Sequence, residues 1–212
     1  MAAGLAACSM FQGESIDGNW TSPTGAKVMY EEALKTAGSE EVFTYSDHKL
    51  EEIMTKAELN LNVKEDKATF EMLMYVDSDA FFTALKDEQN AAFTEELKKM
   101  GFTYESLDPQ QKAEVDANRL SDDELHDLVS DSINQMAKEL GGEYDAKGGY
   151  VKADVFDGDV DRTKETLDIT EINDVVAEGL VEKGESYKYT FKDGVLTLKG
   201  EKAEDDLVFE KK

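Results

Sequence analysis

Strict alternation of apolar and polar residues on both sides of a long helical segment constrains the fold of this chain more than any other feature. Residues 56–63 and 68–76 each place every second side chain on one apolar face, formed by Ala57, Leu59, Leu61 and Val63 in the first run and by Phe70, Met72, Met74 and Val76 in the second. Such alternation is typical of half-buried β-strands. The polar residues 64–67 between the two runs predict a turn, so we expect a β-hairpin here.

Between residues 77 and 142 the apolar period lengthens to between three and four residues, which predicts helices. Asp108 followed by Pro109 is a favourable helix start. The strongest helix signal begins where Ser121 and Glu124 form a capping box, and it ends at Gly141. Its apolar stripe consists of Leu125, Leu128, Val129, Ile133, Met136 and Leu140. We therefore expect a helical insertion over about residues 77–142.

Further strand signals lie before and after these two regions. Strands are expected at residues 16–21, 41–45, 150–156, 166–170, 187–191, 195–199 and 207–209, and one short helix at residues 26–37, ending at Gly38. Asp193-Gly194 suits the turn of the last hairpin, because both residue types tolerate positive φ. Residues 172–181 fit one or two helical turns.

This arrangement predicts an α+β fold built on one antiparallel sheet. A doubly wound sheet needs a helix after each strand, whereas the helices here are confined to the insertion and to one short piece near the start. Short strands joined by tight turns close into a barrel or a roll, because closure removes unpaired edges. We expect residues 16–212 to form a single domain of this kind, preceded by a tether over residues 1–15.

The front and the rear of the chain resemble a known barrel family. Gly18-Asn19-Trp20 is similar to the short G-x-W signature of lipocalins and bacterial lipocalin-like domains, and the aromatic strand, Asp-Gly turn and final strands at the C-terminal end resemble the same group. The resemblance implies a lipocalin-like (calycin-type) barrel over residues 16–76 and 145–212. It also implies that Trp20 lies in the first strand and plugs one end of the barrel.

The single cysteine follows small residues at the front of the chain. Leu5-Ala6-Ala7-Cys8 resembles the lipobox of bacterial lipoproteins, and the polar residues 9–19 resemble a tether. This resemblance implies a lipid attached to Cys8 and an extracytoplasmic protein anchored to the bacterial cell membrane. Only seven uncharged residues precede Cys8, whereas a signal peptide needs a basic and a longer apolar region. We therefore expect a longer precursor and no lipidation of the chain as it stands; the alternatives are a chance match and an ordinary structural cysteine.

The net charge of −25 limits the partners that this chain can bind. Nucleic acids require clustered Lys and Arg, so no nucleic-acid partner is expected. Anionic lipid surfaces repel the chain for the same reason, so contact with a membrane is expected only through the anchor at Cys8. Two explanations of the negative charge remain: it attracts a cationic partner, or it only keeps the protein in solution.

Residues able to carry chemistry are sparse in the sequence. His48 and His126 belong to no metal-ligand spacing, and neither a G-x-S-x-G motif nor a Gly-rich phosphate loop is present. Residues 157–168 place acidic side chains at alternate positions but lack the Gly and Glu of an EF-hand loop, so a solvated hairpin turn is the preferred interpretation. We expect no enzyme, no cofactor and no metal site. A hydrolase using two of the many carboxylates is the remaining enzymatic alternative.

The aromatic and methionine faces leave two binding hypotheses open. Inward side chains of a barrel either fill a core or line a cavity. The residues that would line a cavity are Tyr187, Tyr189, Phe191, Phe70 and Met72. In the leading hypothesis they bind a small apolar or amphipathic ligand inside the barrel, with the helices as a lid. In the alternative the core is filled, and the acidic helices bind an envelope protein.

Overall fold

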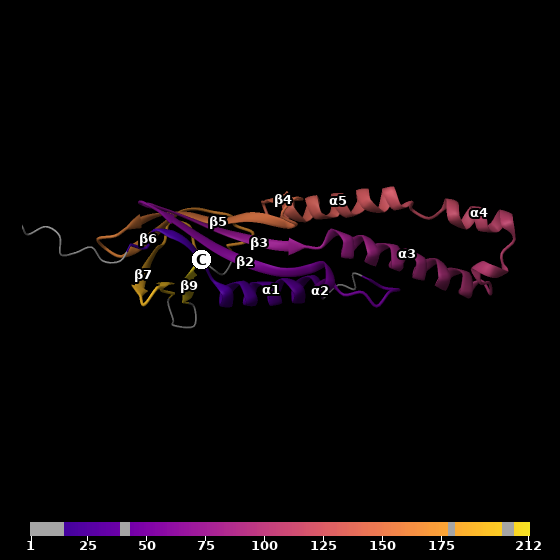
Figure 1. The fold of residues 1–212 in the computed structure, drawn as a ribbon, viewed down its shortest axis with the longest axis horizontal. Coiled ribbons are helices and arrows are strands. Elements are labelled where there is room, and N and C mark those ends of the chain that lie inside the picture. The colour runs from indigo at the N-terminus through magenta and orange to yellow at the C-terminus, as the bar shows by residue number, and fades with distance from the viewer. Residues whose placement is uncertain (1–14, 39–42, 178–180, 201–205) are drawn as a thin grey trace, which may run out of the picture. The chain divides into compact units, whose positions relative to one another are not determined.

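The computed structural model describes residues 15–38, 43–177, 181–200 and 206–212. Within these ranges the elements follow the chain in this order: β1 (Gly18–Thr21), α1 (Pro23–Gly38), α2 (Leu50–Ile53), β2 (Met54–Lys64), β3 (Lys67–Val76), α3 (Ser78–Lys99), the 3₁₀ turn η1 (Tyr104–Ser106), α4 (Pro109–Ala117), α5 (Asp122–Glu139), β4 (Glu143–Asp145), β5 (Tyr150–Asp161), β6 (Thr166–Ile172), β7 (Ser186–Lys192), β8 (Val195–Leu198) and β9 (Leu207–Lys211). The expected hairpin is therefore β2–β3, and the expected helical insertion contains α3, α4 and α5 (Figure 1).

Eight of the strands form a closed antiparallel β-barrel, which confirms the expected fold class. The strand order is β3-β2-β1-β9-β8-β7-β6-β5-β4, and an additional β3–β5 pairing closes the ring while β4 continues the sheet beyond β5. Apart from the interruption by the insertion, each barrel strand pairs with the next strand along the chain. This is the up-and-down order of lipocalin-like barrels.

Two seams join parts of the barrel that are far apart in sequence. In the first, β1 lies between β2 and β9, so that Trp20 is paired with Leu61 on one side and Lys211 on the other. In the second, β3 meets β5: the Val160 N–H donates to the Asp66 carbonyl at 2.9 Å. These seams remove the open edges that a flat sheet would expose.

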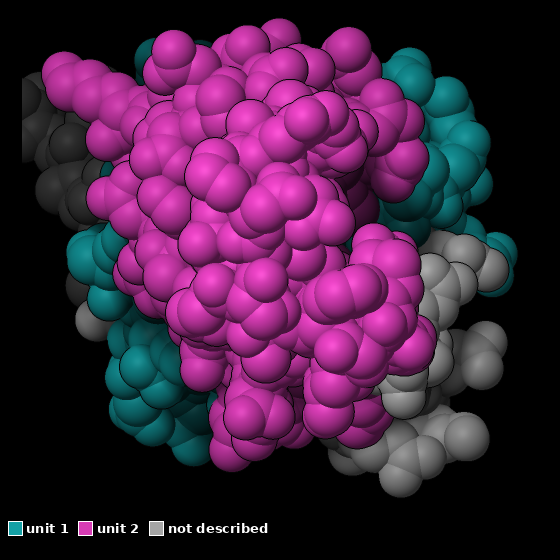
Figure 2. Space-filling model, turned by 90° about the vertical axis from the view of Figure 1, so that its right-hand side faces the viewer, with its two compact units in different colours: residues 1–25, 59–71, 154–212 teal, residues 26–58, 72–153 magenta. Residues whose placement is uncertain are grey.

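The chain divides into two compact units that share the long strands. Unit 1 contains residues 1–25, 59–71 and 154–212, and unit 2 contains residues 26–58 and 72–153 (Figure 2). Strands β2, β3 and β5 pass from one unit into the other without an intervening loop.

Unit 2 has its own apolar core between helices and strand ends. The buried cluster comprises Ile53, Met54, Met74, Val76, Ala84, Val129, Ile133, Ala137 and Val151. In this unit α3 and α5 run side by side away from the strand ends, and α4 lies at their far end (Figure 1). The stripe expected on α5 is thereby largely confirmed, because Leu125, Val129 and Ile133 are buried whereas Leu128 is 41% exposed.

Two local expectations need correction. Thr44–Ser46 forms a bend instead of a strand, because a carboxylate of α3 accepts hydrogen bonds from the backbone N–H groups there. Residues 41 and 42 lie outside the described ranges. Strand β5 does not end at Phe156 but continues through a β-bulge at Asp157-Gly158 to Asp161. The register with β6 shifts there and skips Thr170, and the consecutive residues Val155 and Phe156 of β5 are both buried.

Other expectations hold at the level of single residues. Asp108 caps α4 and Ser121 caps α5, each as part of a capping box. Asp193 and Gly194 have φ values of 54° and 79°, as a tight hairpin turn requires. In the described part of the chain, no helix combines the length and the apolar character needed to cross a bilayer.

Candidate functional site

Phe70, one of the aromatic residues expected inside the barrel, packs against two further phenylalanines of unit 1. Phe70 is fully buried, with its ring centroid 5.1 Å from that of Phe156 and 5.5 Å from that of Phe209. Both of these partners are also fully buried. Contacts at these distances are those of a packed aromatic cluster, which favours a filled core over a cavity at this place.

Trp20 is fully buried on β1, as the resemblance to lipocalins implies. Its indole Nε1 donates to the Ile16 carbonyl at 2.8 Å, and its ring meets that of Phe191 edge to face at 5.4 Å. Phe191, expected to line a cavity, is therefore in contact with the residue expected to plug the barrel.

The two tyrosines of β7 differ in their surroundings. Tyr189 is 7% exposed, and burial raises its pKa. The Tyr187 hydroxyl accepts a hydrogen bond from the Glu182 N–H at 3.1 Å, so it faces the loop before its own strand. Met72, the remaining residue expected to bind ligand, is buried on β3.

Cys8 lies outside the described residues, and its expected lipid attachment stays a prediction. The acidic residues 157–168 form the β5–β6 hairpin, in which Asp159 is paired with Asp168 across the ladder. Lys67 forms an ion pair with Asp159, and Lys164 forms one with Asp161 at 2.8 Å. No group of three or more His, Cys, Asp or Glu side chains in the described ranges is arranged to hold a metal ion.

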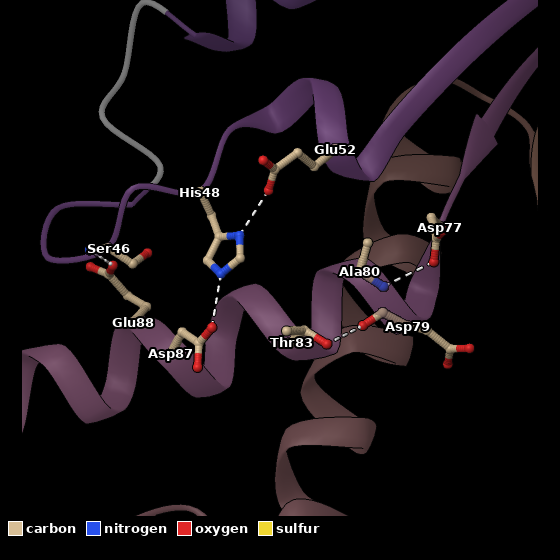
Figure 3. Close-up of polar contacts among 9 residues, drawn as sticks. All are labelled: Ser46, His48, Glu52, Asp77, Asp79, Ala80, Thr83, Asp87 and Glu88. Carbon is tan, nitrogen blue, oxygen red and sulfur yellow. Dashed lines mark hydrogen bonds and ion pairs between the residues drawn. The ribbon is translucent and has the colours of Figure 1, made fainter.

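His48 lies between two carboxylates and joins the segment before α2 to α3 (Figure 3). Its Nδ1 is 2.8 Å from Glu52 Oε2, and its Nε2 is 3.0 Å from Asp87 Oδ2. These hydrogen bonds, with Asp87 first and Glu52 second, raise the pKa of His48. Because both ring nitrogens face carboxylates, the protonated ring is favoured and no lone pair is free to act as a general base.

Glu88, the residue after Asp87, fixes the bend before His48 (Figure 3). Its carboxylate accepts hydrogen bonds from the backbone N–H groups of Thr44, Tyr45 and Ser46 at 2.7 to 2.9 Å. Burial acts to raise the pKa of Glu88, but these hydrogen bonds outweigh it and the pKa is lowered. His126, the second histidine, is exposed and stacks on Phe82 with ring centroids 4.0 Å apart.

Unit 2 has a groove of about 530 Å³ between the end of α3 and α4. We call it the distal groove. Its lining consists of Phe93, Glu96, Leu97, Met100, Phe102, Leu107, Gln111, Glu114, Val115 and Asn118. None of these residues was singled out by the sequence patterns as a binding residue.

The C-terminus of α3 builds one wall of the distal groove. Gly101 has φ of 82°, and two hydrogen bonds close the helix end: Phe102 N–H to the Leu97 carbonyl at 2.9 Å and Gly101 N–H to the Lys98 carbonyl at 3.0 Å. This is a Schellman motif, which turns the chain sharply and usually brings the side chain after the glycine onto the last helical turn. Here it places Phe102 and Leu97 on the same groove.

The second wall, α4, is held by caps and by Tyr104 of η1. Asp108 accepts hydrogen bonds from the N–H groups of Gln110 and Gln111, both at 2.9 Å. Tyr104 donates its hydroxyl to Asp116 at 2.7 Å, which joins the start of this segment to the last turn of α4. No side chain of α4 is buried, so the helix relies on these polar contacts for its position.

Arg119 packs between two aromatic rings beside the distal groove. Its guanidinium carbon lies 5.2 Å from the centroid of Phe93 and 5.4 Å from that of Tyr104. Its Nε is buried without a hydrogen-bond partner in the described structure, so stacking is its principal contact. Through Phe93, this stacking fixes one lining residue of the groove.

A side-chain amide ties the link between α4 and α5 back to α3. Gln89 accepts from the Leu120 N–H at 2.7 Å and donates to the Leu120 carbonyl at 3.2 Å. Lys86 forms an ion pair with Asp122 at 2.8 Å one turn earlier on α3. These contacts join α3 to the link between α4 and α5, so the two helices that line the distal groove are held together by polar contacts.

The lining of the distal groove combines apolar side chains with negative charge. Met100 is 62% exposed and Phe102 is 46% exposed, although both are large apolar residues. Glu96 and Glu114 stand on opposite helices, and among the described residues neither forms an ion pair and no cation belongs to the lining. Exposed apolar side chains in a groove rimmed by polar residues are a feature of many contact sites.

Comparison with known proteins identified no relative of this chain. No protein-family model, no curated protein and no solved structure matches the chain. The barrel and the geometry of unit 2 therefore carry the functional argument.

Proposed function

We propose that this protein is a non-enzymatic binding module of the bacterial envelope, in which the barrel is a packed support and the acidic helical insertion binds a basic partner protein. The observation that carries the proposal is the distal groove, which combines exposed apolar side chains with two carboxylates that form no ion pair with any residue the structure describes. It matches the alternative hypothesis from the sequence more closely than it matches a ligand inside the barrel.

Charge supports the assignment of a basic partner. Residues 77–142 contain sixteen Asp and Glu against six Lys and Arg, within a chain whose net charge is −25. A field of this sign accelerates encounter with a positively charged surface and repels nucleic acids and anionic lipids.

The aromatic packing in unit 1 supports the role given to the barrel. A small-molecule site of ordinary size needs a cavity of about 300 Å³ or more. The contacts of Phe70, Phe156 and Phe209 place side chains where such a ligand would bind. Burying aromatic side chains in this way stabilises a scaffold.

Lipid anchoring at Cys8 is part of the proposal and rests on residues 5–8 alone. Metabolic labelling with a fatty-acid analogue tests it in a bacterial host that expresses the chain behind a lipoprotein leader. We expect label on the parent protein and none on Cys8→Ala. Label on both proteins, or on neither, would contradict attachment at Cys8 and an anchored location.

Partner binding is tested by capture of envelope proteins on the immobilised full chain and on two neutralised variants. The first variant removes five charges from the insertion: Glu96→Gln, Glu114→Gln, Asp123→Asn, Asp127→Asn and Asp131→Asn. The matched control removes five charges from unit 1: Asp174→Asn, Glu182→Gln, Glu185→Gln, Asp193→Asn and Glu210→Gln. The control keeps the same net charge as the first variant, so it isolates the position of the charge.

We expect a basic protein that is retained by the parent and by the control, is eluted by salt, and is lost with the insertion variant. Equal loss with both variants would reduce the binding to net charge and contradict a dedicated surface. Saturable binding of an apolar dye that disappears on substitution of Tyr189 would favour the barrel ligand instead.

A further inference from the structure

We infer that the distal groove binds one amphipathic α-helix of the partner protein, with the apolar stripe of that helix in the groove and its basic residues on Glu96 and Glu114. This inference rests on the proposed function, since it specifies the partner of the same site. It is carried by the shape, the lining and the charge of the groove.

The exposure of the lining decides against a small molecule as the occupant. Sites for small molecules bury most of the ligand surface. In the distal groove, six lining residues are exposed: Glu96, Met100, Phe102, Gln111, Glu114 and Asn118. A groove that leaves so much of its wall in contact with solvent is suited to an occupant that brings its own surface to cover it.

The walls of the groove decide which kind of peptide fits. Both walls are the flanks of helices, α3 and α4, whose backbone groups are already used within the helices. An extended peptide adds to a binding site mainly through backbone hydrogen bonds to a sheet edge, and no strand borders this groove. An amphipathic helix satisfies its own backbone and presents apolar anchors at positions i, i+3, i+4 and i+7.

The carboxylates of the groove indicate which charge the bound helix carries beside its apolar stripe. Glu96 belongs to α3 and Glu114 to α4, so each of the two helices that line the groove contributes one carboxylate. Two neighbouring cations have other contacts: Lys98 pairs with Glu95 at 3.2 Å, and Lys112 lies over the Tyr104 ring at 5.6 Å. A helix with Lys or Arg on both sides of its apolar stripe complements this arrangement.

The same reasoning excludes a second copy of this chain and a membrane. A second copy brings its own charge of −25 and would be repelled at the groove. An anionic bilayer would be repelled in the same way. The exposed Met100 side chain fits a helix-binding surface, because methionine adapts to differently shaped apolar partners.

Three synthetic peptides test the inference with the full chain in solution. The first is an amphipathic helix of about four turns with Leu at i, i+3, i+4 and i+7 and Lys flanking the stripe. The second has the same composition in an order that destroys the stripe. The third keeps the stripe and replaces every Lys with Glu. Affinity is measured by fluorescence anisotropy at low and at physiological salt, and helix formation on binding by circular dichroism.

Protein variants place the bound peptide. Met100→Ser and the pair Glu96→Gln with Glu114→Gln alter exposed lining residues and should leave the fold intact. The matched control alters α5 outside the groove, with Leu128→Ser and Asp127→Asn, since Leu128 is 41% exposed as well. Thermal unfolding of each variant verifies that it is folded.

We expect only the first peptide to bind and to gain helix on binding. Met100→Ser should weaken its affinity by about fivefold or more. The double substitution Glu96→Gln with Glu114→Gln should weaken the affinity and reduce its dependence on salt. The α5 control should bind as the parent does. Equal binding of the first two peptides would overturn the inference while leaving a general basic partner intact. The inference would also be overturned if the first peptide bound the groove variants as tightly as the parent, or did not bind at all. In either case, the capture experiment with the five-charge variants would test the proposed function separately.

Discussion

His48 is the residue whose charge responds to pH near neutrality in a way that the structure explains. Its hydrogen bonds to Asp87 and Glu52 raise its pKa, so the folded state binds the proton more tightly than the unfolded state does. The stabilisation is complete below the ordinary histidine pKa of about 6.5 and is lost as pH rises through the raised value. At acidic pH, Glu52 matters as well. Its hydrogen bond to His48 lowers its pKa, so the stabilisation that the ionised Glu52 contributes is lost as pH falls through that lowered value.

We expect the difference in free energy of unfolding between the parent and His48→Gln to be larger at pH 5.5 than at pH 8.5. Urea titrations at both values measure it. His126→Gln serves as the control, because that ring stacks on Phe82 and lies outside any ion pair in the described structure. A difference that is constant with pH would contradict the role given to the two carboxylates.

Arg119 holds the end of α4 through its flat face instead of through an ion pair. Lysine keeps the charge but lacks the planar group that stacks on Phe93 and Tyr104. A double-mutant cycle with Arg119→Lys and Tyr104→Leu should give a coupling energy of about 0.5 to 1 kcal/mol in thermal or urea unfolding. Additive losses would show that the stacking contributes nothing to stability.

Among the elements, the C-terminus of α3 depends on one glycine. Gly101 has φ of 82°, and no atom lies within 4 Å of the position where a Cβ would stand, so the cost of a side chain there is conformational. Gly101→Ala should lower the free energy of unfolding by about 1 kcal/mol, and Gly101→Asn by less, because asparagine tolerates this region better. Equal stability of the glycine and alanine proteins in urea would contradict the Schellman geometry.

The secondary structure of most elements was predictable because its causes are local. Alternation at residues 57–76 gives the β2–β3 hairpin, and the caps at Asp108 and Ser121 set where α4 and α5 begin. The bend at Thr44–Ser46 was wrongly predicted as part of a strand, because Glu88, more than forty residues later, binds its backbone N–H groups. Such a long-range partner leaves no periodic signal in the local sequence.

The distal groove could not be predicted from the sequence for a related reason. Its lining comes from the end of α3, from the turn after it and from α4, and α4 has no apolar stripe of its own. Periodicity identifies the apolar face of a helix but does not tell whether another element covers it. The expected barrel residues, in contrast, were easy to find because every second residue of a barrel strand points inward.

At the scale of the whole molecule, we expect the net charge of −25 to lower the stability of the folded state. Like charges repel one another more in the compact state than in the unfolded chain, and salt screens this repulsion. We expect the urea midpoint to rise between about 10 mM and 200 mM NaCl. The variant with five neutral residues in the insertion should show a smaller rise. A fall in midpoint would mean that the surface ion pairs outweigh the repulsion.

The barrel's closure through β3 and β5 has a consequence for the order in which the chain assembles. These neighbours are separated by the whole helical insertion, yet the Val76 N–H bonds to the Gly149 carbonyl at 2.9 Å. Closing so long a loop is entropically costly unless the intervening residues are already compact. Early pairing of α3 with α5 would bring the two strands together, so pulse-labelling hydrogen exchange should find amides of these helices protected before those of the β3–β5 seam.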